Sequence, residues 1–139
     1  MSKIAKFDLP EILPNIGTLN SPPWLLNFDG NDYPIKISSS KMKLIKQTQE
    51  CACCGLKGSF FHLEAGEHHG PHLNLYGIGP RNRHVRLTVD HILPHSKGGT
   101  RNMNNVQLLC EKCNNKKGNK VITIEELRQR IFPKTEKDL

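Results

Sequence analysis

The sequence has few aromatic residues and no long hydrophobic run, and each shortage narrows the classes of protein that it can encode. Aromatic residues make up 6% and hydrophobic residues 36% of the 139 residues, so we expect a small core. A chain with such a core often needs a bound metal for stability. No apolar stretch approaches the length of a transmembrane helix, which argues against a membrane protein.

The N-terminus lacks the apolar stretch of a secretory signal, because Pro10, Glu11 and Pro14 interrupt it. We therefore expect a cytoplasmic protein, in which thiols stay reduced. Under that condition the five cysteines of the chain indicate metal binding before disulfide formation.

Acidic residues are scarce in one part of the chain. Residues 1–35 carry two Lys and four acidic residues, a net charge of −2, whereas residues 81–120 carry nine Lys or Arg and two acidic residues, a net of +7. A positive field concentrated in this way is typical of a segment that binds phosphates. Few aromatic residues lie among these cations, which disfavours a stacking surface for single strands.

The prolines also divide the chain. Residues 1–38 contain five prolines that break any periodicity, and we expect an irregular N-terminal arm. The arm either packs back on the domain through Trp24 or forms a partly disordered leader. Residues 39–139 are expected to form the domain, with its core in residues 51–118.

Apolar residues alternate with period two in two neighbouring segments, residues 72–78 and 84–90, which predicts two strands. Turn-forming residues 79–82 join them into a hairpin. A weaker alternation predicts another strand over residues 59–64, and residues 66–71 are expected to form a loop.

Other segments carry helical signals, namely apolar positions three and four residues apart and capping side chains. The spacing of Val106, Leu109, Cys110 and Cys113 places these residues on one helical face. The predicted helices are residues 39–49, capped by Ser39 or Ser40, residues 104–118, ended by Gly118, and residues 124–131, capped by Thr123 and Glu126.

Four of the cysteines form two Cys-x-x-Cys pairs, Cys51 with Cys54 and Cys110 with Cys113. Two such pairs complete the tetrahedral shell of one Zn²⁺ ion, and four thiolates leave no position open for catalysis. The sequence therefore predicts a structural zinc site. Cys53 fits the spacing less well than Cys54, although it can substitute for it.

Three blocks of sequence in order carry a family resemblance: Asp90-His91-Ile-Leu-Pro-His-Ser-Lys-Gly-Gly, then Asn105-Val-Gln-Leu-Leu-Cys, then Cys113-Asn114-Asn-Lys-Lys-Gly. Residues 51–118 thereby resemble the zinc-containing His-Asn-His (HNH) endonucleases. The resemblance implies an α+β protein with a ββα-metal, treble-clef-like core, built from an antiparallel hairpin and a helix. It also implies double-stranded DNA as the substrate.

The resemblance assigns a role to each motif residue. His91 is the general base that activates water, because a neutral imidazole suits that task. Asp90 and Asn114 supply oxygen ligands to one catalytic Mg²⁺ or Mn²⁺, which stabilises the leaving 3′-oxygen. Asn105 holds the loop around His91 by hydrogen bonds, or caps a helix, and the two roles are compatible.

One motif position departs from the pattern, because Asn114 stands where the family often has histidine. The chain is thus an HNN variant, which favours oxygen coordination and hence Mg²⁺ or Mn²⁺ over softer ions. Asn115 is an alternative ligand, but it points about a quarter turn away on a helix.

Basic residues of the same segment are the expected phosphate contacts. His84 and His95 are further candidates for contacts to DNA or metal, with an exposed polar side chain as the alternative. The expected DNA-binding residues are Lys97, Arg101, Lys116, Lys117, Lys120 and Arg86, with Arg81 and Arg83 beside them on the hairpin.

A non-catalytic zinc module that only binds nucleic acid is the competing interpretation, but it has no need for Asp90, His91 and Asn114 together. By analogy with small free-standing members of the family, the protein is expected to be phage-borne. A homodimer or a DNA-packaging (terminase) partner is compatible with this interpretation.

Overall fold

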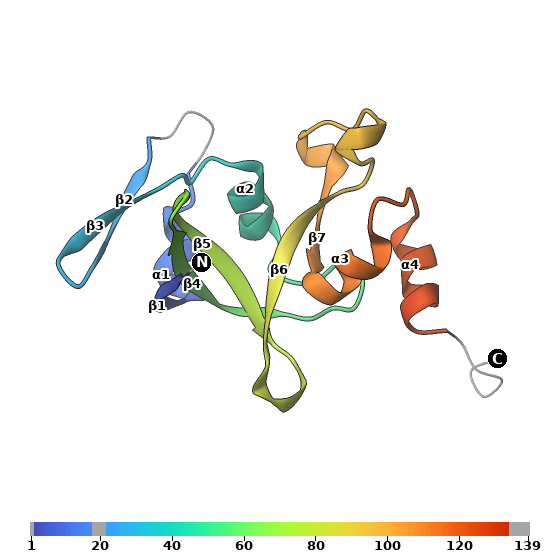
Figure 1. Cartoon of the computed structure of the whole chain (residues 1–139), viewed down its shortest axis with the longest axis horizontal. Coiled ribbons are helices and arrows are strands. Elements are labelled where there is room, and N and C mark those ends of the chain that lie inside the picture. The colour runs from blue at the N-terminus through green and yellow to red at the C-terminus, as the bar shows by residue number, and fades with distance from the viewer. Residues whose placement is uncertain (1, 18–21, 134–139) are drawn as a thin grey trace.

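The computed structural model describes residues 2–17 and 22–133, and these residues form one five-stranded antiparallel sheet, a separate two-stranded hairpin and surrounding helices (Figure 1). The strand order in the larger sheet is β1-β4-β5-β6-β7. Mixed helices and antiparallel strands make this an α+β fold, as the sequence predicts. The strands of this sheet are β1 (Ser2–Asp8), β4 (Gly58–Gly66), β5 (His69–Ile78), β6 (His84–His91) and β7 (Val106–Cys110).

The larger sheet has two halves, β1-β4-β5 and β6-β7, which are hydrogen-bonded to each other only near the turn between β5 and β6. Strands β5 and β6 pair over Leu75–Ile78 and His84–Leu87 alone. Beyond these residues β5 continues beside β4, and β6 continues beside β7 (Figure 1). Helix α2 (Ser40–Gln47) contacts both β6 and β7. The end of β6, which carries Asp90 and His91, therefore pairs with β7 alone and has no β5 residue beside it.

The helix expected after residue 39 is confirmed as α2. The Ser39 hydroxyl accepts a hydrogen bond from the backbone N–H of Met42, which caps the helix. Met42, Leu44 and Ile45 are buried, as the helical spacing predicts.

The three predicted strands are also confirmed, as parts of β4, β5 and β6. Their alternate residues Phe61, Leu63, Leu75 and Leu87 are buried in the core. The loop expected at residues 66–71 is shorter than predicted, because β4 ends at Gly66 and β5 begins at His69.

The expectation of an irregular N-terminal arm is wrong for the described residues. Strand β1 pairs with β4, and β2 (Trp24–Phe28) pairs with β3 (Asn31–Ile35) in a hairpin that projects from the body (Figure 1). Pro10 is tolerated because it lies in the first turn of α1 (Leu9–Ile12), where its missing N–H costs no hydrogen bond.

Trp24 packs against the core, as one of the two interpretations of the arm predicts. The leader interpretation extends over residues 18–21, which lie outside the described residues. The domain boundary at residue 38 stays a prediction.

The helix predicted from Asn104 is wrong in its first half. Val106–Cys110 form β7, and helix α3 spans only Glu111–Lys117. The apolar residues of this short run are buried on both faces of the strand, so their spacing does not distinguish a strand from a buried helix. The ββα unit of the fold is consequently β6, β7 and α3, not the β5–β6 hairpin.

The C-terminal predictions are confirmed. Gly118 ends α3 with a positive φ of 56°, which glycine adopts without strain. Thr123 and Glu126 form the capping box of α4 (Ile124–Ile131), whose Leu127 is fully buried. Among the described residues, none of the helices has the length and apolar character needed to cross a membrane.

Candidate active site and metal centre

An open cleft of about 310 Å³ lies where β6 ends and α3 crosses it. Strand β6 brings Asp90 and His91 to the cleft, and α3 brings Asn114. His95, from the loop after β6, lines the same cleft and is exposed. Residues that are distant in the sequence thus meet at one site, as the predicted roles of a base and metal ligands require.

The Asp90 carboxylate is almost buried, with 7% of its surface exposed, and it is already paired. The Lys117 ammonium lies 3.0 Å from Asp90 Oδ2 and 3.3 Å from Oδ1. Gln107 Nε2 donates a hydrogen bond of 2.9 Å to Oδ2. Both partners orient the carboxylate, and the Lys117 ammonium also compensates for its negative charge.

Lys117 itself is fully buried, so the expectation that it contacts DNA is wrong. It lies on the face of α3 that packs against β6, where it also donates a 3.2 Å hydrogen bond to the backbone carbonyl of His91. Its neighbour Lys116 is exposed. A pair of adjacent lysines in a sequence does not reveal which one faces inward.

Asn114 is oriented through Thr88. The Thr88 hydroxyl donates to the carbonyl of Leu109, and its oxygen accepts a 3.1 Å hydrogen bond from Asn114 Nδ2. Because the amide nitrogen is engaged in this way, the amide oxygen of Asn114 is the atom available for another partner. Asn115, the alternative ligand, is exposed and does not line the cleft.

The loop between β6 and β7 is held by Asn105. Its side chain accepts a hydrogen bond from the N–H of Leu93 and donates to the carbonyls of Leu93 and Thr100. Its own carbonyl accepts from the N–H of Ile92, directly after His91. Strand β7 begins at the next residue, so the helix-cap interpretation of Asn105 is wrong.

The same loop needs its glycines. Gly98 has a φ of +89°, a conformation that other residues rarely adopt. A Cβ atom on Gly99 would lie 1.7 Å from the carbonyl oxygen of Leu93, so a larger residue does not fit there.

His91 is half-buried at the wall of the cleft. Within the described part of the chain, no hydrogen bond holds its imidazole, and the contacts that fix this residue are made by its backbone. The ring is therefore free to bind a ligand through either nitrogen.

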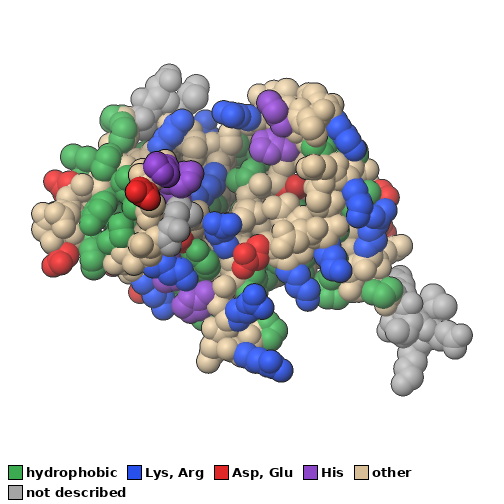
Figure 2. Space-filling view, viewed as in Figure 1, with side chains coloured by type: hydrophobic (Ala, Val, Ile, Leu, Met, Phe, Trp, Pro, Cys, Tyr) green, Lys and Arg blue, Asp and Glu red, His purple; other side chains and the backbone are tan. Residues whose placement is uncertain are grey.

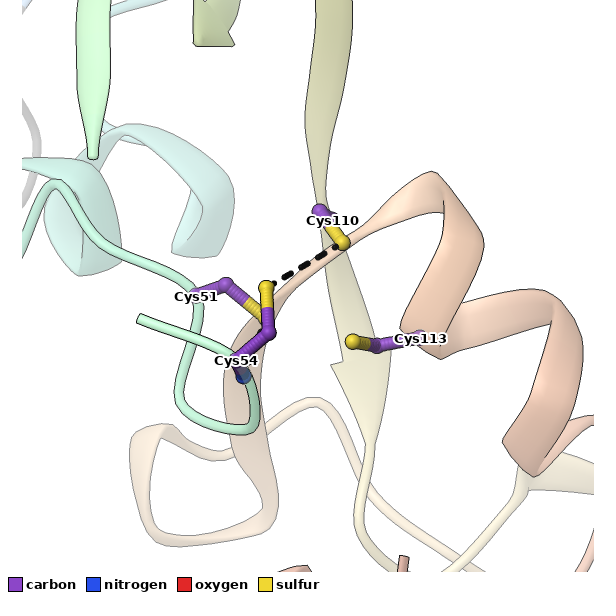
Figure 3. Close-up of side chains that lie close together, drawn as sticks. All are labelled: Cys51, Cys54, Cys110 and Cys113. Carbon is purple, nitrogen blue, oxygen red and sulfur yellow. Dashed lines mark hydrogen bonds between the residues drawn. The ribbon is translucent and has the colours of Figure 1, made fainter. Parts of the chain in front are cut away.

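The candidate metal centre lies at the start of α3, where the four predicted cysteines meet (Figure 3). The sulfur atoms of Cys51, Cys54, Cys110 and Cys113 all lie within 4.8 Å of one another, with Cys54 and Cys110 at 3.7 Å. Zinc–sulfur bonds of about 2.3 Å in a tetrahedron require sulfur atoms about 3.8 Å apart. These four cysteines can hold a metal ion, whereas Cys53 lies outside the group.

Local structure prepares the cysteines for this role. Gly55, with a φ of +77°, lets its N–H reach the carbonyl of Cys51 and close the first knuckle. Burial, with the neighbouring thiols, raises the pKa of Cys113. Burial also opposes ionisation of Cys51, but hydrogen bonds from backbone N–H groups lower its pKa. A cation among the sulfurs would compensate for the cost of ionising them.

Most of the expected DNA contacts lie on the surface, and Figure 2 shows basic side chains on the side of the molecule formed by β6, β7 and α3. Arg86 is only half-buried, and its Nε atom is buried without a partner. The exposed members of the expected set are Lys97, Arg101, Lys116 and Lys120, with Arg81 and Arg83 at the β5–β6 turn.

Sequence reasoning missed three residues that shape the cleft: Lys117 in its buried role, Gln107 and Thr88. Each contacts a motif residue that is distant in the sequence: Lys117 and Gln107 contact Asp90, and Thr88 contacts Asn114. Gln107 lies directly opposite Asp90 in the β6–β7 pairing, which is the one signal that a correct strand prediction would have supplied.

A strand that ends in Asp-His, a returning strand and a crossing helix, beside four cysteines that can hold a metal ion, have the arrangement of a ββα-metal fold. Residues 79–120 match the sequence model of the HNH endonuclease family. The match covers β6, β7 and α3. No curated protein and no solved structure matches the chain.

Proposed function

We propose that this protein is a metal-dependent endonuclease that hydrolyses phosphodiester bonds of double-stranded DNA. One observation carries the proposal: Asp90, His91 and Asn114 line a single open cleft within the segment that matches a nuclease family. A module that only binds nucleic acid has no need for this combination of an imidazole and two oxygen donors.

His91 is the general base in this proposal. A neutral imidazole accepts a proton near neutral pH, and the ring of His91 is exposed to the cleft without an internal partner among the described residues. The backbone of His91 is fixed by Lys117 and by the β6–β7 pairing, so the ring meets water and phosphate from a defined position. His91 takes the proton from the attacking water.

The donor set of the cleft fits a hard divalent cation such as Mg²⁺ or Mn²⁺. Asp90 would offer a carboxylate oxygen and Asn114 its free amide oxygen, and such ions keep water and phosphate oxygens as their other ligands. When bound, the ion supplies positive charge to the leaving 3′-oxygen, which gives 5′-phosphate and 3′-hydroxyl ends. Lys117 and Gln107 hold the Asp90 carboxylate in place.

The cysteine cluster holds a structural Zn²⁺ in this proposal. It presents four sulfur atoms from three segments, two of them on the loop before β4, one at the end of β7 and one on α3. Zinc would thereby tie the start of the domain to the helix that carries Asn114. Four thiolates fill the coordination shell, so the ion has no position for substrate.

The direct test is cleavage of a supercoiled plasmid by the purified full chain with Mg²⁺, with Mn²⁺ and with EDTA. We expect nicked or linear product with either ion, none with EDTA, and ends that a ligase rejoins without further treatment. A protein that binds the plasmid but leaves it intact with both ions would support the non-catalytic zinc module instead.

A further inference from the structure

A second cleft, of about 370 Å³, adjoins the first one at His91. Val89 and His91 line both clefts, so they form the wall between them. The other residues of the second cleft come from the segment that leads into α2 and from the β6–β7 loop. They are Lys36, Ser38, Ser39, Ser40, Lys41 and Arg101.

The lining of this cleft is cationic and rich in hydroxyl groups, and it contains no carboxylate among the described residues. The ion pair between Lys117 and Asp90 is the one salt bridge in the described ranges, so Lys36 and Arg101 have no acidic partner there. Both side chains are exposed. Ser40 Oγ donates a 3.1 Å hydrogen bond to the carbonyl of Arg101, which fixes the start of α2 against the loop.

Lys41 adds a third cation, whose surroundings lower its pKa. Its ammonium donates a 2.6 Å hydrogen bond to Asn74 Oδ1. Burial and, to a smaller extent, the charge of Arg86 lower its pKa to about 8, while the charge of Glu64 acts in the opposite direction. An anion in the cleft would stabilise the charged form.

Helix α2 begins in this cleft and contributes the positive end of its dipole. Ser39 caps the helix through the N–H of Met42, and the N–H groups of Ser40 and Lys41 belong to the first turn, which lacks acceptors within the helix. This arrangement, combined with three cationic side chains, is suited to a phosphate group.

We propose that this cationic cleft binds a phosphate of the DNA strand adjacent to the phosphate that reaches His91. The inference rests on the proposed nuclease function, because the shared wall at His91 is what makes the two phosphates neighbours. It also assigns residues 36–41, which lie outside the matched segment 79–120, to the DNA-binding surface. Phosphate contacts of this kind fix the position of the strand without reading its sequence.

The test uses the variant Lys36→Gln/Arg101→Gln, with Arg130→Gln on α4 as the control for loss of an exposed positive charge. Binding to a duplex is measured in EDTA, where no cleavage occurs, over a series of salt concentrations. We expect the double variant to bind about tenfold or more weakly at low salt, because it loses charge-assisted hydrogen bonds. The slope of log affinity against log salt should fall by roughly 0.9 for each phosphate that the variant no longer neutralises.

A second measurement locates the phosphate. Duplexes with one uncharged methylphosphonate linkage, moved step by step past the cleavage site, are bound to the wild type and to the double variant. We expect one linkage beside the cleavage site to weaken binding by the wild type but to weaken binding by the double variant no further, because the two changes remove the same interaction.

The outcomes separate the two proposals. If the wild type cleaves DNA but the double variant binds like Arg130→Gln, or loses affinity additively at every linkage, the cationic cleft is not a phosphate site. If the wild type neither binds nor cleaves DNA, the proposed function fails and the cleft proposal fails with it.

Discussion

The cysteine cluster and the His91 cleft lie on the same ββα unit, yet they are built in opposite ways. The cluster consists of four identical soft donors, mostly buried, that face one another at short distance. The cleft is open, its donors are mixed, and its carboxylate is already paired with Lys117. Cys113 and Asn114 are consecutive residues of α3, so one turn of helix serves both sites. The difference indicates that substitutions one residue apart can separate stability from chemistry.

Removal of a cluster ligand should have the largest effect on the fold. Cys110→Ser is expected to abolish cooperative unfolding, because binding a structural zinc ion contributes on the order of 10 kcal/mol to folding. Thermal unfolding followed by circular dichroism, together with the zinc content of the purified protein, measures this. Cys53→Ser is the matched control, since Cys53 is buried nearby but lies outside the cluster. If Cys110→Ser unfolded as cooperatively as the control and without zinc, the structural role would be refuted.

Lys117 offers a sharper comparison, because its neighbour on α3 has the same side chain. Lys117→Met should destabilise the protein by about 3–5 kcal/mol, since it leaves the Asp90 carboxylate buried without its partner. The exposed Lys116→Met should change stability by less than about 0.5 kcal/mol. Denaturant unfolding of both variants gives the difference.

The double variant Asp90→Asn/Lys117→Met distinguishes pairing from simple packing. It removes both charges, so we expect it to recover much of the stability lost in Lys117→Met. We expect no cleavage by this variant, because the Asp90 carboxylate is gone. Equal stability of the single Lys117 and Lys116 variants would mean that the buried ion pair does not organise the site.

Substitution of Asn105 should have a smaller effect, on both stability and cleavage activity. Asn105→Ala removes three side-chain hydrogen bonds to the loop and is expected to cost about 1–3 kcal/mol. Cleavage should fall further than the loss of folded protein explains, because the loop that follows His91 loses its anchor at Leu93 and Thr100. Asn104→Ala, which changes an exposed neighbour, should leave both quantities unchanged. Identical behaviour of the two alanine variants would argue against a role of Asn105 in holding the loop.

The parts of the structure that the sequence predicts are those with a local signal. Two Cys-x-x-Cys pairs predict the cluster, the Ser39 cap predicts α2, and the Thr123–Glu126 box predicts α4. The alternation of the residues before Asp90 and His91 places these two at a strand end. In each case neighbours along the chain carry the information.

The remaining features depend on contacts between distant segments. Residues 106–110 are buried on both faces, so the pattern of β7 resembles that of a helix. Strand β1 joins the sheet only through its pairing with β4, and its proline-rich surroundings conceal this. Lys117 faces inward because α3 lies on β6, and no local pattern distinguishes it from Lys116. The segment before α2 lines a cleft with His91 because α2 packs against β6 and β7, which is also a contact between distant segments.

The most direct test of the catalytic assignment is His91→Ala, measured for cleavage and for stability in the same preparation. We expect plasmid cleavage with Mg²⁺ to fall by a factor of at least about 10². Zinc content, thermal unfolding and duplex affinity in EDTA should match those of the wild type, because His91 lies at the open cleft and outside the cysteine cluster. Cleavage by His91→Ala at the wild-type rate would contradict the central claim.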